Sequence, residues 1–208
     1  MMYAADFRRQ AWQRLSGRWG TMVVITLLYC AVSAILAYTF IGSLLLSGVF
    51  ALGLASVTLS LTRLGEAKAE SLFDGFKFNF TNAIVASALY NVFLALWTML
   101  FVIPGLVKYY SYSMTFYILR DNPDMPANDA ITASRQMMDG HKLRLFCLHL
   151  SFIGWILLAI LTLGIGFLFV FPYMQTAQAA FYEDLRNRQR SFDYFGESAP
   201  RDYFGENK

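Results

Sequence analysis

The stretch WILLAILTLGIGFLFVFPYM, residues 155–174, decides the fold that this sequence predicts. It lies inside an apolar block that runs from Leu145 to Tyr182. One membrane-spanning helix needs about 20 apolar residues, so this block is long enough for two. The glycines of TLGIG (Thr162–Gly166) favour a tight reversal in its middle. The block therefore predicts a helical hairpin that crosses a membrane twice and has an uncharged tip.

Two further apolar blocks of similar size occupy Thr21–Leu61 and Ala83–Leu119. Their predicted tips are FIGS (Phe40–Ser43) and IPG (Ile103–Gly105). The 208 residues are 57% hydrophobic and only 15% charged, whereas soluble domains are about 45–50% apolar and about 25% charged. We therefore predict an all-α polytopic membrane protein with six transmembrane helices in three hairpins, which form one domain over residues 1–190.

The charged residues lie almost entirely between and beside these blocks. All 14 acidic residues and all but one of the 17 basic residues fall before, between or after the hairpins. The positive-inside rule makes the side that carries them cytoplasmic. The apolar run from Thr21 is too long for the apolar region of a secretory signal, so we read it as a retained first helix. These observations predict a protein of the cytoplasmic membrane with both termini in the cytoplasm.

Each hairpin is preceded by a similar phrase. LSGRW (Leu15–Trp19), FDGFK (Phe73–Lys77) and MDGHK (Met138–Lys142) each follow a short amphipathic stretch. A repeating unit of an interfacial helix, a glycine break and two crossings would divide the chain into residues 3–62, 64–120 and 127–184. The structural breaks that this unit predicts are Gly17, Gly75 and Gly140 before the hairpins and Pro104, Gly105 and Gly166 at their tips.

A second periodic feature lies inside the hairpins, where a glycine near each tip precedes a threonine by ten residues. The pairs are Gly48 and Thr58, Gly105 and Thr115, and Gly166 and Thr176. Coincidence stays an alternative, because glycine and threonine are common. The second helix of each hairpin also carries more polar and small residues than the first. We therefore expect the second helices to form the inner packing set, either as helix–helix contacts or around a polar path.

Lys108 is the single basic residue away from the cytoplasmic side, and it follows the Ile103–Gly105 tip by about one turn. Near the outer interface its ammonium group can reach the headgroup phosphates without a binding role. The alternative is a lipid or anion contact made by Lys108 together with Tyr109 and Tyr112.

The sequence offers little catalytic or metal-binding chemistry. His141 and His149 have no carboxylate partners at ligand spacing, and Cys147 lies two residues from His149 and so on another helix face. Ser134, His141 and Asp139 are the residue types of a catalytic triad, but the sequence indicates no oxyanion hole beside them. We predict no catalytic residues, no metal, no cofactor and no enzymatic activity.

The net charge is only +3, and the basic residues lie beside apolar blocks. This placement favours anionic lipid as a partner and not nucleic acid. Residues 191–208 carry the pentapeptide DYFGE twice, at 193–197 and 202–206. We predict a flexible cytoplasmic tail. Its aromatic residues would bind a cytosolic or membrane protein partner, lie at the membrane interface, or have no function; they are Tyr194, Phe195, Tyr203 and Phe204.

Several phrases together resemble a known family. FDGF, IPGLVKYYSYSMTFYIL, DNPD, AITASRQMMDGHK, LSFIGWILLAILTLGIG and PYMQTAQAAFYEDL, in this order, resemble the bacterial integral membrane family catalogued as domain of unknown function 975. The resemblance covers about residues 5–186, and its second half is the more specific. It implies a polytopic membrane protein of bacteria and implies no activity.

Two functional hypotheses follow. The first is a non-enzymatic scaffold or accessory protein that organises the membrane, with membrane lipids, a second copy of itself and a tail-bound protein as partners. The alternative is a transporter or channel-like protein that passes a small or amphipathic solute along the second helices of the three hairpins. An enzyme acting on lipid is the least supported, because the spans contain no acid–base pair.

Overall fold

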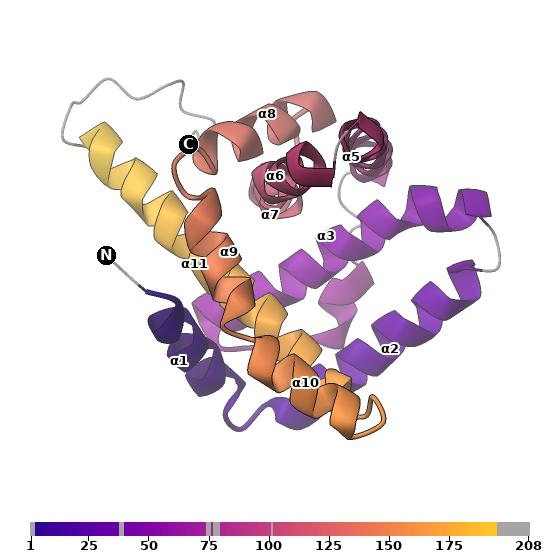
Figure 1. Cartoon of the computed structure of the whole chain (residues 1–208), viewed down its shortest axis with the longest axis vertical. Coiled ribbons are helices and arrows are strands. Elements are labelled where there is room, and N and C mark those ends of the chain that lie inside the picture. Colours follow the sequence, from indigo (N-terminus) through magenta and orange to yellow (C-terminus); the bar gives the residue numbers. More distant parts are fainter. Residues whose placement is uncertain (1–2, 38–39, 74–75, 77–79, 101, 195–208) are drawn as a thin grey trace.

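The computed structural model describes residues 3–37, 40–73, 76, 80–100 and 102–194, and this part of the chain is helical without any strand. The helices, in the order of Figure 1, are α1 (Ala4–Leu15), α2 (Trp19–Ala37), α3 (Phe40–Leu64), the short 3₁₀ helix η1 (Ala69–Phe73), α5 (Phe80–Leu100), α6 (Val102–Tyr112), α7 (Thr115–Asp121), α8 (Ala127–Met137), α9 (Lys142–Leu150), α10 (Ile153–Leu161) and α11 (Phe167–Tyr194). The all-α class predicted from the sequence is confirmed.

The chain bends by 99° between α1 and α2. Gly17 lies between the two helices with a φ of +82°, a conformation that glycine adopts without strain. The apolar stripe of α1, formed by Phe7, Ala11 and Leu15, is almost fully buried, and the ring of Phe7 lies 5.2 Å from that of Phe181 in α11. The stripe that the sequence assigns to the membrane interface therefore packs against the protein itself.

The first two hairpin tips differ from the predicted ones by a few residues. Phe40–Ser43 belong to α3 and do not form the predicted turn. Ile103, Pro104 and Gly105 lie in the first turn of α6 and do not form the predicted turn either. A proline is tolerated there because the first backbone N–H groups of a helix have no intrahelical acceptor.

The third tip lies where the sequence places it, between α10 and α11 at Thr162–Gly166. Leu163 and Gly164 have φ values of 54° and 88°. The Gly166 N–H donates a hydrogen bond of 3.1 Å to the Thr162 hydroxyl, and a Cβ on Gly166 would lie 2.6 Å from the Cα of Ala159. Gly166 is therefore required for close contact with α10, whereas Gly164 provides the reversal.

The helices between the hairpins are less regular than the repeating unit predicts. Before the second hairpin the described residues include the short helix η1, and Gly75 lies outside them. Before the third, α8 is a full helix, and Gly140 follows it with a φ of +72°. One predicted span is also interrupted, between α6 and α7, whereas α9 and α10 are separated only by a turn at Ser151 and Phe152 that keeps helical dihedrals.

The three glycine–threonine pairs occupy comparable environments. Thr58, Thr115 and Thr176 are each fully buried, and each hydroxyl donates to a backbone carbonyl three or four residues earlier. A Cβ on Gly48 or Gly105 would collide with Ser87 or Thr98 of α5. Buried small residues at these positions allow close contact between helices.

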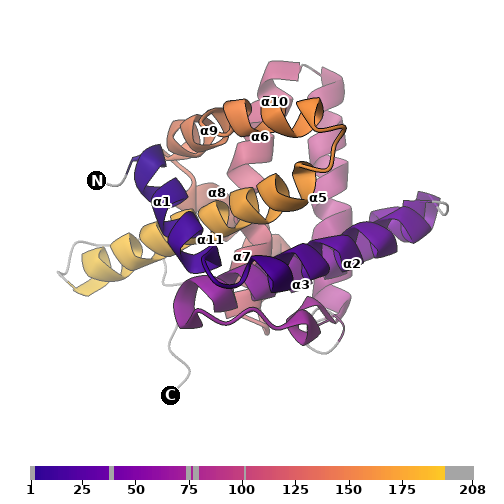
Figure 2. The ribbon, with the colours of Figure 1, turned by 90° about the horizontal axis from the view of Figure 1, so that it is seen from below.

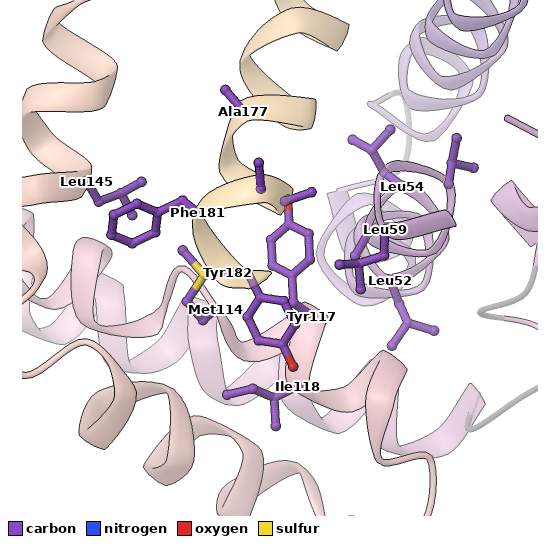
Figure 3. Packing of buried hydrophobic residues seen from close by; sticks show 14 of the residues in the cluster. Leu52, Leu54, Leu59, Met114, Tyr117, Ile118, Leu145, Ala177, Phe181 and Tyr182 are labelled. Carbon is purple, nitrogen blue, oxygen red and sulfur yellow. The ribbon is translucent and has the colours of Figure 1, made fainter. Parts of the chain in front are cut away.

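The core lies where α3, α7 and α11 meet, with α9 beside them (Figure 3). Tyr117 of α7 stacks on Tyr182 of α11 with ring centroids 5.4 Å apart. Leu52 and Leu59 of α3 and Ile118 of α7 are almost completely buried around this pair. The second helices of the three predicted hairpins therefore form the centre of the molecule.

Among the described residues, two helical segments are long and apolar enough to cross a membrane, Phe80–Thr98 and Lys142–Leu161, or three if the bent pair α1–α2 is counted. Six spans are therefore not confirmed. Figure 1 shows α5 and α6 end-on while α2, α3 and α11 lie lengthwise, and Figure 2 shows α5 and α6 running steeply across α2 and α3. No single direction follows all the hairpins.

Candidate functional site

The residues predicted to contact lipid or an anion lie together on α6, and two of them, Tyr109 and Tyr112, line a common cavity. The Lys108 ammonium lies 4.6 Å from the ring centre of Trp97 in α5. Tyr112 is buried, whereas Tyr109 is exposed. Both tyrosines line a cavity of about 150 Å³, and Lys108 is not among its lining residues.

This cavity lies between α2, α3, α5, α6, α7 and α11, and aromatic rings dominate its wall. Tyr90 of α5 lies 6.0 Å from Tyr112 and 6.2 Å from Phe116, measured between ring centroids. Gln178 of α11 donates its amide to the Ser113 carbonyl over 3.4 Å. The lining residues are Tyr29, Ala51, Leu54, Ala55, Tyr90, Tyr109, Tyr112, Ser113, Phe116, Tyr117, Gln175 and Gln178. We call this site the tyrosine cavity.

The break between α6 and α7 helps to shape the tyrosine cavity, because Ser113 and Phe116 flank it. Ser134 of α8 bridges the break, since its hydroxyl donates to the Ser111 carbonyl over 2.9 Å and accepts from the Met114 N–H over 3.2 Å. The sequence contains no periodic signal for this bridge. Ser134 thus satisfies backbone groups that the interruption of the helix would otherwise leave unpaired.

Ser134, Asp139 and His141 are not arranged as a triad. The Ser134 hydroxyl is engaged with backbone atoms of α6 and α7. Asp139 is paired with Lys142, 3.7 Å away, and the Nδ1 atom of His141 is buried without a hydrogen-bond partner. The described residues also contain no group of three or more histidine, cysteine, aspartate or glutamate side chains placed to hold a metal ion. Cys30 and Cys147 are exposed free thiols.

A second candidate site is a cluster of charged residues, which we call the ion-pair cluster. Arg63 lies in the last turn of α3, Asp121 ends α7, and Glu183 and Arg186 lie on α11. The Arg63 guanidinium donates two hydrogen bonds to Asp121, of 2.8 and 2.7 Å, and one of 2.7 Å to Glu183. The Tyr182 hydroxyl donates a further bond of 2.7 Å to Asp121. The cluster joins the cytoplasmic ends predicted for the second helices of all three hairpins.

The charge of Asp121 is stabilised although its side chain is only 4% exposed. Burial alone would raise its pKa, but the hydrogen bonds and charge of Arg63, the Tyr182 hydroxyl and the charge of Arg186 together hold the pKa below its ordinary value. The sequence shows these charges as scattered residues at helix ends, because their pairing depends on how the hairpins pack.

Next to this cluster, Arg144 of α9 and Asp184 of α11 form an ion pair of 2.9 Å. The Arg144 guanidinium also lies over the rings of Phe7 and Phe181, at 5.9 and 5.4 Å from their centres. Arg188 joins the same carboxylate over 3.1 Å. Arg144, four residues after the glycine break at Gly140, thus connects α1, α9 and α11.

Gly140 and His141 can be separated by substitution. Gly140→Ala is expected to lower the free energy of unfolding by about 1 kcal/mol, because alanine is strained at the φ of +72° although its Cβ would meet no atom within 4 Å. His141→Ala should change stability less. Thermal unfolding in detergent compares them, with Gly20→Ala as the control because a Cβ there also meets nothing. A larger loss in His141→Ala would contradict the structural role of Gly140.

The described chain is thus an all-helical protein with two to three helices of membrane-spanning length. Residues 99–189 match the family described as Protein of unknown function (DUF975), so the chain carries a domain of this family over that segment. The resemblance seen in the sequence is confirmed for its second half. Searches of the curated proteins and of the solved structures gave no match. The matched segment contains α6–α10, most of α11 and the carboxylates of the ion-pair cluster.

Proposed function

We propose that this chain is a non-enzymatic integral membrane protein with a scaffold or accessory role in the bacterial cytoplasmic membrane. The observation that carries the proposal is the uncharged apolar surface of α10 and the following tip. Ile153, Leu157, Leu161, Leu163 and Ile165 are all more than half exposed, with 93% for Leu163. An exposed apolar surface of this kind marks a membrane or partner contact. Lipid covers it in the proposed arrangement.

The ion-pair cluster supports a one-sided distribution of charge. Arg63, Asp121 and Glu183 come from three segments far apart in the sequence, and they meet at one place. If the three hairpins each cross the membrane and return, these three helix ends belong on the same side. We therefore propose six spans with cytoplasmic termini, although α5 and α6 run steeply across the other hairpins (Figure 2).

Cysteine labelling tests this topology. In a chain whose Cys30 and Cys147 are replaced by alanine, Leu163→Cys at the third tip should react with a membrane-impermeant maleimide added to intact cells. Asp139→Cys, which is exposed beside α9, should react only after permeabilisation. Val102→Cys at the start of α6 tests the second hairpin. Protection of Val102→Cys in intact cells would remove two of the six proposed spans.

The interior is consistent with a scaffold. Ser56, Thr58, Thr115 and Thr176, on the second helices of the hairpins, are fully buried and bonded to backbone carbonyls, so they line no open path. The small residues of α3 are also used within the chain. Self-association would therefore use a part of the exposed apolar surface that lipid leaves uncovered. At and before α1, the large apolar side chains of Tyr3 and Trp12 are exposed together with Arg9 and Arg14, a composition that favours the membrane interface.

Crosslinked purification from membranes tests the scaffold role. The full chain is expected to retain a specific protein partner and a copy of itself, and a chain that ends at residue 190 is expected to lose the protein partner. A chain in which Tyr194, Phe195, Tyr203 and Phe204 are all replaced by serine is the matched control of equal length. Unchanged partners in both variants would exclude recruitment by the tail.

The transporter hypothesis is favoured by one observation, the tyrosine cavity, which lies against the second helices of all three hairpins. Solute uptake into vesicles that contain the purified protein, measured with and without substitutions in the cavity, would separate transport from binding alone.

A further inference from the structure

We propose that the tyrosine cavity binds the alkylammonium group of an organic cation. The inference rests on the cavity alone, so it holds for a scaffold that binds a lipid headgroup as well as for a transporter. Three observations support it: the aromatic wall of the cavity, the lack of charge on its twelve lining residues, and its size.

The aromatic wall has the composition that a cation needs. Six of the twelve lining residues are aromatic, and five of them are tyrosines. The face of an aromatic ring carries partial negative charge and attracts an ammonium group placed within about 6 Å of its centre. The ring centroid of Tyr90 lies 6.0 Å from that of Tyr112 and 6.2 Å from that of Phe116. One bound group can therefore contact more than one of these rings.

The lining residues of the cavity provide no positive counter-charge for an anion. None of its twelve lining residues is charged, so an anionic ligand would be desolvated without a counter-charge. Lys108, the basic residue of α6, places its ammonium group over the ring of Trp97 and not in the cavity. This contact shows that the same helix pair already holds one cation on an aromatic face. Gln175 and Gln178 add amide oxygens that can accept hydrogen bonds from a cation's substituents.

The size restricts the ligand. A cavity of 150 Å³ resembles one that admits benzene, and drug-sized ligands occupy about 300 Å³ or more. The cavity therefore accommodates a trimethylammonium or similar small head, while any longer chain of the ligand would extend outside.

Binding of choline tests the proposal against its uncharged isostere. The full chain is purified in a maltoside detergent, which carries no ammonium group, and is titrated with choline, with 3,3-dimethylbutan-1-ol and with inorganic phosphate. Saturation-transfer NMR detects binding through the methyl protons of the first two, and a rise in the unfolding temperature detects binding of any of them. We expect choline to bind more tightly than the isostere and phosphate not to bind. Equal binding of choline and its isostere, or binding of phosphate alone, would overturn the proposal.

Substitutions locate the binding. Tyr90→Leu should weaken choline binding by roughly 2- to 30-fold, the range expected for one lost cation–π contact, while Tyr90→Phe keeps the ring and should retain most of the affinity. Ala51→Leu, which narrows the cavity without removing a ring, should weaken choline binding even if Tyr90→Leu fails to fold. Unchanged binding in Ala51→Leu would place choline elsewhere and sink the proposal.

An alkylammonium group can come from a lipid headgroup or from a soluble cation, and lipid nanodiscs distinguish these two sources. If the natural ligand is a lipid headgroup, phosphatidylcholine discs should weaken the binding of free choline relative to phosphatidylglycerol discs. Equal binding of choline in both discs would assign the cavity to a soluble cation, and both results support the cationic class.

Discussion

Asp121→Asn is expected to lower the free energy of unfolding by about 3 kcal/mol. Removing one partner of a buried ion pair leaves uncompensated charge and typically costs about 3–5 kcal/mol. Asp121 accepts hydrogen bonds from both Arg63 and Tyr182, and its side chain is 4% exposed. We expect a loss at the lower end of this energy range because the Arg63 side chain is 32% exposed and still pairs with Glu183.

Thermal unfolding in detergent measures this loss, and a decrease of roughly 6–12 °C corresponds to it for a chain of this size. Asp139→Asn is the matched control, since Asp139 is 83% exposed and lies 3.7 Å from Lys142. Exposed pairs of this kind contribute little. Similar unfolding temperatures for the two variants would show that the ion-pair cluster does not hold α3, α7 and α11 together.

The effect of pH gives an independent readout. The folded pKa of Asp121 lies below its ordinary value. Its stabilisation is therefore fully present above the unfolded carboxyl pKa of about 3.9 and is lost as the pH falls through the lower folded pKa. The difference between the wild type and Asp121→Asn should be constant from pH 8 to pH 5 and shrink only below about pH 4.

The sequence predicted those features that depend on local composition. Apolar length and glycine placement identified the helices and the α10–α11 tip, because reversals require residues such as Gly164 that tolerate positive φ. The first two tips were displaced because Phe40 and Pro104 are compatible with the start of a helix as well as with a turn. The interruption at Ser113 and Met114 was not predicted, since its stabilising partner is Ser134, twenty residues away.

The candidate sites were predicted only in part, because they depend on how the helices pack. Tyr109 and Tyr112 were selected for their proximity to Lys108, yet they line a cavity that Lys108 does not. Tyr29, Tyr90 and Gln175 belong to the same wall and come from three other helices. Only Gln175 had a sequence signal, the enrichment of polar residues in the second helices, whereas Tyr29 and Tyr90 lie on first helices and had none.

Gly53→Ala is expected to destabilise the chain by roughly 1–3 kcal/mol or more, which is typical of an overpacked core. Gly53 lies in α3, and a Cβ there would collide with the backbone carbonyl of Leu72 in η1. Leu72 is fully buried, so η1 cannot move away without breaking the core. The clash opposes the helix propensity of alanine, which by itself favours the substitution by up to about 1 kcal/mol.

Gly154→Ala is the control for this substitution, because Gly154 also lies in a helix and a Cβ there would meet no atom within 4 Å. Its unfolding temperature should be equal to or higher than that of the wild type. The two variants add the same methyl group to a helical glycine, so any difference between them measures the contact of α3 with η1. If both variants were equally stable, η1 would not be packed against α3, and the connection between the first two hairpins would have to follow another course.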